Sequence, residues 1–202
     1  MLYAKNELSK KITAKPLLLG FCPGCRAEIT PKCGMIKRWH WSHKPNTKCN
    51  ISKSESAWQL EWKSKIPIDN CEVVIEKQEK LKLADCQLSS GKVIEFEDNF
   101  SLKNIQEKES FYNYLIWVFD GRKHLKNIDL LSPIERDEKT FYVDFLWHKP
   151  KRSIKQCEQP IFFDFGFYGV VRIKNIYNDY PFTAGAILGD RQMMIDWIYN
   201  NA

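Results

Sequence analysis

The chain has 202 residues, of which 44% are hydrophobic and 28% charged, which excludes a disordered or low-complexity protein and is enough for one domain or a compact pair. It contains no apolar run of the roughly 18 residues that a membrane span needs and no signal-peptide cleavage site, so we expect a cytoplasmic protein without membrane contact. The net charge of +6 favours a polyanionic partner, and seven cysteines, including one Cys-x-x-Cys pair, favour metal binding over a disulfide framework.

The first zone, residues 1–50, is expected to form strands and turns around a cysteine and histidine cluster. The predicted zinc ligands are Cys22, Cys25, His40 and His43. Four such ligands close a tetrahedral shell, so this zinc would stabilise the fold and leave no position for catalysis. Cys33 and Cys49 are alternative ligands, and a redox or merely structural Cys-x-x-Cys is the competing interpretation.

A basic and aromatic stretch follows in the same zone. Its candidate nucleic-acid-binding residues are Lys37, Arg38, Trp39 and Lys44. Lysine and arginine pair with phosphates and tryptophan stacks on bases, so one interpretation is a nucleic acid surface. The other is a zinc knuckle that packs its tryptophans against the rest of the protein.

Helical spacing begins at Ser54, a candidate N-cap, and ends at Pro67. Within it Glu55, Gln59 and Lys63 recur at i, i+4 and i+8, so we expect them to share one helix face. A lysine on this face is a candidate phosphate contact, although a solvated surface lysine is equally common.

Three carboxylates fall on expected strands on either side of a Ser-Ser-Gly turn. In 93–97, period-two alternation directs Glu95 and Glu97 to one face, and the turn can return Asp85 to their side. Such oxygen ligands suit Mg²⁺ or Mn²⁺, which activate water and stabilise charge on a phosphodiester. The competing interpretation is a solvated strand edge, because acidic and apolar residues alternate on many half-exposed strands.

The other elements complete an α/β or α+β pattern. Strands are expected at 73–75, 83–85, 93–97, 115–119, 141–147, 161–165 and 169–173, and helices at 102–114, capped by Ser101, and 191–199. The aromatic-rich residues 123–202 have two interpretations: they complete the core, or they form a surface for a homodimer or another protein.

The order of these motifs resembles the CoiA-like competence nucleases, a branch of the PD-(D/E)xK phosphodiesterase superfamily. The likeness covers about residues 20–122. The segments 21–25 and 37–44 resemble the family's cysteine/histidine segment, 55–63 its first core helix, 83–86 its Ala-Asp-Val strand and 93–97 its Ile-Glu-Phe-Gln strand. Gln59 stands where a histidine is frequent in the family.

The resemblance implies a zinc-binding segment over 1–50, a restriction-endonuclease-like core over 51–125 with a mixed sheet flanked by helices, and a C-terminal region over 126–202. It implies a DNA nuclease that uses metal-activated water, in competence, DNA processing or phage defence. Asp85 and Glu95 would bind Mg²⁺ or Mn²⁺, with Glu55 completing or orienting the coordination.

Position 97 departs from the family, because most of the superfamily has lysine there and this branch usually glutamine. Glu97 would face the attacking water, yet it is anionic and cannot stabilise a phosphorane by positive charge. A third carboxylate can act as general base or bind a second ion. The alternative function is therefore a catalytically impaired module that retains the nuclease fold and binds DNA or a protein partner.

Overall fold

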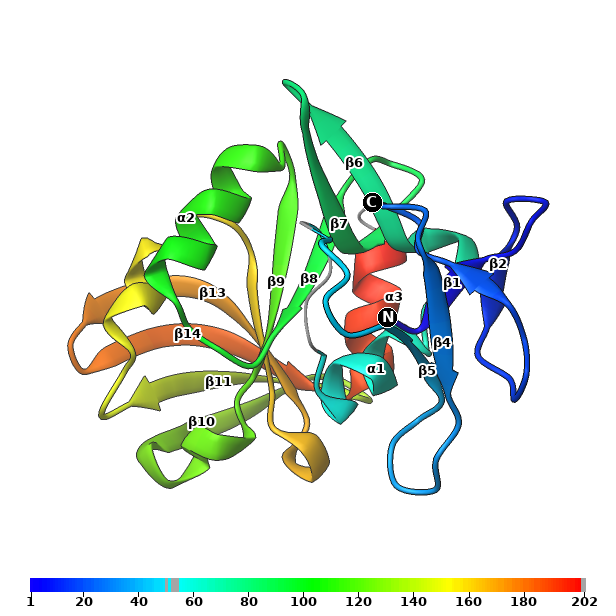
Figure 1. Cartoon of the computed structure of the whole chain (residues 1–202). Helices are drawn as coiled ribbons and strands as arrows, with labels where there is room; N and C mark the ends of the chain where they lie inside the picture. Colours follow the sequence, from blue (N-terminus) through cyan, green and yellow to red (C-terminus); the bar gives the residue numbers. More distant parts are fainter. Residues whose placement is uncertain (50, 52–54, 201–202) are drawn as a thin grey trace. The chain divides into compact units, whose positions relative to one another are not determined.

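The computed structural model describes residues 1–49, 51 and 55–200 and divides them into two compact units (Figure 1). The first unit is Met1–Ser89 and the second is Ser90–Ala202. This division falls between the domain limits expected at 50 and 125. Among the described residues, no helix combines the length and apolar character that crossing a bilayer requires.

The first unit contains a sheet with the strand order β2-β1-β3-β4-β5. Its strands are β1 (Tyr3–Lys5), β2 (Lys11–Thr13), β3 (Gly20–Phe21), β4 (Glu28–Lys32) and β5 (His40–His43). All paired strands in this sheet are antiparallel. Its small core contains Met1, Ala4, Ala14, Cys22, Ile29 and Trp41.

Helix α1 (Ala57–Lys63) begins later than the sequence predicts. Ser56 is the N-cap, and it forms a capping box with Gln59: the Gln59 amide donates to Ser56 Oγ, and the Ser56 amide donates to Gln59 Oε1. Gln59 therefore holds the helix start, and Glu55 precedes the helix. The N-cap predicted at Ser54 lies outside the described residues.

A 3₁₀ turn, η1 (Ile68–Asn70), leads from α1 into an antiparallel hairpin of β6 (Cys71–Lys77) and β7 (Lys80–Gln87). Both strands are longer than the runs that the sequence predicts around 73–75 and 83–85. Cys71 and Cys86 are cross-strand partners, with Sγ atoms 3.3 Å apart.

The second unit is a mixed sheet with the strand order β10-β11-β14-β13-β12-β9-β8. The strands are β8 (Val93–Glu97), β9 (Leu115–Asp120), β10 (Ile128–Asp137), β11 (Thr140–Trp147), β12 (Ile161–Asp164), β13 (Val170–Asp179) and β14 (Phe182–Gly189). Neighbours β8, β9 and β12 are parallel, and the remaining pairs are antiparallel. A mixed α+β fold with few helices is confirmed.

The parallel pair β8 and β9 is joined by helix α2 (Leu102–Phe111) in a β-α-β unit (Figure 1). Ser101 is the N-cap, as predicted, and its side chain accepts from the Asn104 amide at 3.5 Å. The other helical elements are α3 (Arg191–Asn200) and the 3₁₀ turns η2 (Arg122–Asn127), η3 (Arg152–Gln156) and η4 (Gly166–Tyr168).

The two faces of this sheet differ, because cross-strand partners share a face. One face holds an aromatic core in which Phe163 stacks on Phe145 and contacts Trp147 edge-on, with ring centroids 5.5 and 5.7 Å apart. The opposite face carries the line Tyr142, Ile187, Arg172 and Phe162 across β11, β14, β13 and β12. Strands β10 and β14 were not among the predicted elements, and β13 extends six residues beyond the predicted end at 173.

Candidate functional site

Four metal-ligating side chains converge in the first unit: Cys22, Cys25, His43 and Cys49. Each offers one ligand atom, and these atoms all lie within 4.8 Å of one another. His43 Nε2 is 3.3 Å from Cys25 Sγ, and the Sγ atoms of Cys22 and Cys49 are 4.0 Å apart. Ligands at about 2.0–2.3 Å from a tetrahedral zinc ion lie roughly 3.3–3.8 Å from one another, so this donor set fits structural zinc.

A tight knuckle between β3 and β4 carries Cys22 and Cys25. The Cys22 amide donates to the Ala27 carbonyl at 2.9 Å, and the Arg26 amide donates back to the Cys22 carbonyl at 3.0 Å. At the tip, a Cβ on Gly24 would come within 1.6 Å of Ile51 Cδ1. A larger residue at this position would require the Ile51 side chain to move, so glycine suits the tip of the knuckle.

The structure corrects the predicted ligand set at one position, where Cys49 replaces His40. Residues His40 and His43 lie three apart on β5, so strand alternation directs them to opposite faces. His43 shares its face with the buried Trp41, whereas His40 Nδ1 lies 2.9 Å from the Arg38 carbonyl oxygen. Cys49, which the sequence indicates as an alternative, completes the group.

Burial affects the metal-binding forms of His43 and Cys22 in opposite ways. Burial lowers the pKa of His43, so its imidazole is neutral at pH 7, the form that ligates metals. Burial raises the pKa of the Cys22 thiol to about 12. A metal that binds Cys22 must therefore displace a proton.

The predicted nucleic-acid-binding stretch has mixed surroundings. Trp39 is 46% exposed, and Lys37 and Arg38 are exposed beside it. Lys44 pairs with Glu28 at 2.9 Å on the surface, so its charge is shared. Trp41, by contrast, belongs to the core of the first unit.

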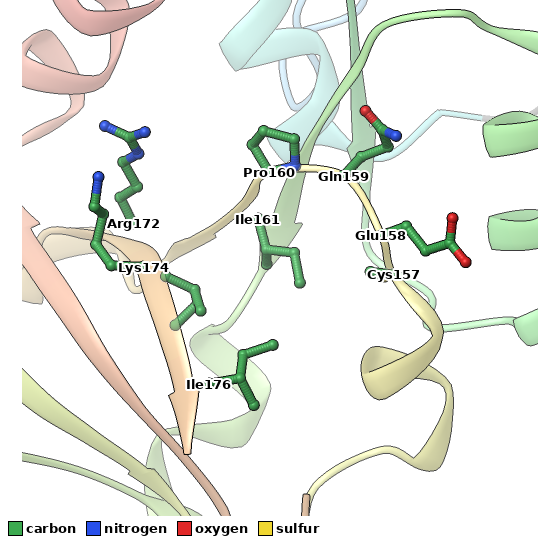
Figure 2. Close-up of a pocket in the computed structure, with 9 residues that line it drawn as sticks. Cys157, Glu158, Gln159, Pro160, Ile161, Arg172, Lys174 and Ile176 are labelled. Atoms are coloured by element: carbon green, nitrogen blue, oxygen red, sulfur yellow. The ribbon is translucent and has the colours of Figure 1, made fainter. Parts of the chain in front are cut away.

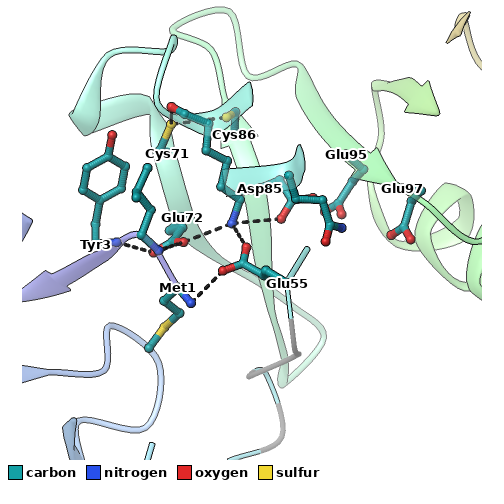
Figure 3. Close-up of polar contacts among 12 residues, drawn as sticks. Met1, Tyr3, Glu55, Cys71, Glu72, Asp85, Cys86, Glu95 and Glu97 are labelled. Carbon is teal, nitrogen blue, oxygen red and sulfur yellow. Dashed lines mark hydrogen bonds and ion pairs between the residues drawn. The ribbon is translucent and has the colours of Figure 1, made fainter. Parts of the chain in front are cut away.

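A second cluster in the first unit surrounds the ammonium of Lys63, which is 1% exposed. Its Nζ is 3.0 Å from Glu72 Oε1, 3.2 Å from Asp85 Oδ1, and in contact with Glu55 Oε1. Figure 3 shows the three carboxylates around these contacts. Lys63 therefore acts as the counter-ion of buried carboxylates in this structure, rather than as a solvated lysine.

Glu72 is a member of this cluster that the sequence did not indicate. Its Oε1 accepts from the Leu2 amide at 2.5 Å and its Oε2 from the Tyr3 amide at 2.9 Å, so it ties β1 to Lys63. It has φ of +51°, a left-handed conformation that is uncommon for glutamate. Backbone strain of this kind is often found at functional sites. No local sequence pattern could have revealed contacts between residues so far apart in the chain.

Mutual attraction governs the charge states of the cluster. Burial disfavours the charged form of Lys63, but Glu72, Asp85 and Glu55 together hold its pKa well above the ordinary lysine value. Burial likewise opposes ionisation of Glu55, and the Lys63 ammonium together with the N-terminal ammonium of Met1, 2.6 Å from Glu55 Oε2, more than offsets it, so the pKa of Glu55 is lowered. Lys63 and Glu55 are therefore both charged at neutral pH.

A third cluster, within the second unit, joins β8 to α2. Lys108 Nζ contacts Glu95 Oε2 and Glu97 Oε1, and the three side chains are buried. The ammonium also lies 5.6 Å from the ring centroid of Trp117, whose Nε1 donates to Glu109 at 2.7 Å. Glu95 and Glu97 share one face of β8, as the alternation predicts, and their burial contradicts a solvated strand edge.

Lys108 is the second site residue that the sequence analysis missed, although a signal existed. Ile105, Lys108 and Phe111 recur at i, i+3 and i+6 and are the buried residues of α2. A lysine on the apolar face of an amphipathic helix needs a buried anion, and the acidic strand β8 precedes this helix.

Comparison with known proteins gives one match. Residues 9–52 match the family described as competence protein CoiA, N-terminal domain. The matched range contains all four side chains of the metal-ligating group. Neither the curated proteins nor the solved structures include a match to the chain.

The first prediction concerns the metal group. Cys49→Ser should abolish stoichiometric zinc binding and destabilise the protein by more than about 2 kcal/mol, because structural zinc contributes directly to folding. Zinc content by mass spectrometry and thermal unfolding measure the two effects. His40→Ala and Cys33→Ser are the matched controls and should retain zinc. Loss of zinc in His40→Ala, with zinc retained in Cys49→Ser, would instead support His40 as the fourth ligand, as the sequence predicts.

The second prediction concerns Lys63. Lys63→Met should destabilise the protein by about 3–5 kcal/mol, because removing one partner leaves buried carboxylates without their counter-ion. Urea unfolding measures the change. Lys65→Met is the control, because Lys65 is exposed two residues away, and its effect should stay within about 0.5 kcal/mol. Equal effects of the two substitutions would contradict a structural role for the buried ammonium.

The third prediction follows from the lowered pKa of Glu55. The unfolded state binds a proton on this residue more readily than the folded state. Ionised Glu55 therefore adds to the free energy of unfolding at neutral pH, and this addition is lost as pH falls below about 4.3. Urea unfolding at pH values from 7 to 3 should show a shallower acid loss for Glu55→Gln than for the unmodified protein. Glu61→Gln, at an exposed position on α1, is the control, and its free energy of unfolding should fall with pH as steeply as that of the unmodified protein.

Proposed function

We propose that the chain is a CoiA-like, metal-dependent DNA nuclease of the PD-(D/E)xK type with a competence-related role in the cytoplasm. The match of residues 9–52 to the N-terminal domain of the competence protein CoiA supports the competence-related role. The observation that carries the proposal is the buried charge cluster of the second unit. In it a Glu-Phe-Glu strand meets a lysine from the next helix.

The chemistry of the carboxylates supports this assignment. Buried carboxylates are expensive unless a cation compensates them, and here two of them bind the same ammonium. The resemblance implies Glu95 of this cluster and Asp85 of the first unit as ligands of Mg²⁺ or Mn²⁺. Within the first unit, Lys63 links Glu55 to Asp85, so Glu55 would orient Asp85. When bound, such an ion activates water and neutralises charge that develops on the phosphate.

Lys108 resolves the difficulty that position 97 raises. Glu97 is anionic, but the Lys108 ammonium that binds it brings a positive charge to the same end of β8. We assign to Lys108 the electrostatic role that lysine or glutamine at position 97 has elsewhere in the superfamily. Glu97 then acts as a proton acceptor for the attacking water and as the anchor that positions Lys108.

The buried Lys63 has a positioning role in this scheme. It contacts Glu55, Glu72 and Asp85, so it holds Asp85 in place from the side of α1. The zinc group is structural, because its four protein ligands leave no position for a substrate. DNA contacts by Lys37, Arg38 and Trp39 would place this zinc domain on the substrate.

A second candidate function is a DNA-binding module with impaired catalysis. Each candidate metal ligand already contacts a lysine ammonium, so a divalent ion must compete with a tethered cation. This competition for the metal ligands, together with glutamate at position 97, favours a protein that keeps the nuclease fold but no longer cleaves DNA.

The fourth prediction tests cleavage. Purified zinc-loaded protein with Mg²⁺ or Mn²⁺ should cleave single-stranded, duplex or branched DNA, and Glu95→Gln or Lys108→Met should reduce the rate at least about 100-fold. Lys108→Arg should retain part of the rate because it keeps the charge. Lys103→Met, on the exposed side of α2, is the control and should cleave normally.

Circular dichroism and thermal unfolding must show that each variant is folded. If no substrate is cleaved with either metal, and neither Glu97→Gln nor Glu97→Lys restores cleavage, the nuclease proposal fails. Metal-independent DNA retention would then support the impaired module.

A further inference from the structure

The outer face of the antiparallel strands in the second unit has side chains that neither the fold nor the proposed cleavage explains. Arg172 lies on this face, with its Cζ 3.7 Å from the ring centroid of Trp197 on α3 and 6.0 Å from that of Phe162. Two aromatic rings therefore hold the guanidinium in place. Its partner Ile187 pairs in turn with Tyr142, so arginine and tyrosine lie in one line across three strands.

Two more cations join Arg172. Lys174 follows it on β13, at an irregularity between Ile173 and Asn175, and Arg136 of β10 lies with its Cζ 5.8 Å from the Tyr142 ring centroid. The charge of Arg172, burial and the charge of Arg136 all lower the pKa of Lys174. These cations repel one another, and among the described residues Asp137 forms an ion pair only with Arg136, at 3.7 Å. A phosphate near Arg172 and Lys174 would therefore relieve the remaining repulsion.

Exposed aromatic rings flank the cations. Tyr142 is 50% exposed and Tyr177 66% exposed. Tyr177 lies over Gly185 of β14, where an added Cβ would come within 2.6 Å of its hydroxyl oxygen. The absence of a side chain at Gly185 thus leaves room for the hydroxyl end of the Tyr177 side chain above the sheet.

Two hollows meet at Lys174. One, of about 250 Å³, is lined by Tyr142, Tyr177, Asn175 and Asp144. The other, of about 280 Å³, is lined by Arg172, Pro160, Ile161 and Ile176 (Figure 2). In Figure 2 Arg172 and Lys174 extend in the same direction, and Glu158 points away from them.

We infer that this face, defined by Arg136, Tyr142, Arg172, Lys174 and Tyr177, is a binding platform for single-stranded nucleic acid. The cations pair with the phosphates of the strand, and the tyrosine rings stack on unpaired bases. Asp144 and Asn175 offer acceptors to the amino groups of bases. A duplex hides its base faces, so the exposed rings favour a single strand over a duplex.

The platform does not depend on the proposed cleavage, because its residues lie outside the three clusters described above. Its test is therefore a binding measurement without added divalent metal, in which no nuclease activity is needed. The probe is a fluorescein-labelled 20-nucleotide DNA of mixed sequence, followed by anisotropy at several salt concentrations. The same sequence as RNA and as duplex DNA supplies the comparison.

The full-length zinc-loaded protein should bind the single strand more tightly than the duplex. Arg136→Ala with Lys174→Ala should make the dependence of log K on log salt shallower by about 1.4, because each phosphate contact on a single strand contributes about 0.7. Lys103→Ala, which removes an exposed lysine from α2, should leave the slope unchanged.

The tyrosines give an independent test. Tyr142→Leu should weaken binding at least about 5-fold, the lower limit for loss of one stacked base, whereas Tyr142→Phe should bind normally. Tyr114→Leu is the control, since Tyr114 is similarly exposed but lies between α2 and β9.

Three results would overturn the inference. These are an absence of single-strand binding, a preference for the duplex, and equal losses in the platform and control variants. A fourth such result comes from light scattering. If the protein is a dimer, and Tyr142→Leu makes it a monomer without changing DNA binding, the face is a self-association surface. Loss of cleavage with normal binding would affect only the nuclease proposal.

Discussion

The burial of lysine ammonium groups among carboxylates is the constraint on which both units depend. An ion removed from water is tolerated only when an opposite charge and hydrogen bonds replace the solvent. Lys63 meets this condition with Glu55, Glu72 and Asp85, and Lys108 meets it with Glu95 and Glu97. Each lysine comes from a helix and most of its partners come from strands, so these pairs fix the helices against their strands. A hydrophobic contact tolerates sliding, whereas a buried ion pair does not.

The metal-ligating group meets a related need in the first unit. The strands of its sheet are two to five residues long, and its core contains few large side chains besides Trp41. A core of this size stabilises a fold only weakly, and a closed metal shell adds free energy that packing does not provide. The same reasoning explains why Glu72 contacts the backbone of β1: it joins the small sheet to the buried charges.

The two faces of the sheet in the second unit offer different environments. Glu95 shares its face with Trp117 and the aromatic core, where the environment is dry and charge interactions are strong. Arg172 and Tyr142 are on the other face, where solvent screens charges and exposed rings are available to a partner. The proposed cleavage would use the first environment and the proposed single-strand binding the second, and strand alternation supplies both from a single sheet because successive side chains point in opposite directions.

Local patterns in the sequence determined much of this protein. Alternation in 93–97 predicted the strand and the shared face of Glu95 and Glu97, and the spacing of cysteines and histidines predicted a metal group. Only the tertiary structure decided which distant residues complete each cluster. Cys49 replaced His40 because residues three apart on a strand face opposite ways, and Glu72 joined Lys63 through contacts with the distant β1. For Lys108, helical spacing in the sequence was enough to place it on the buried face of α2, but its partners depended on how α2 packs on β8. Periodicity records which way a side chain points, and only folding determines what it meets.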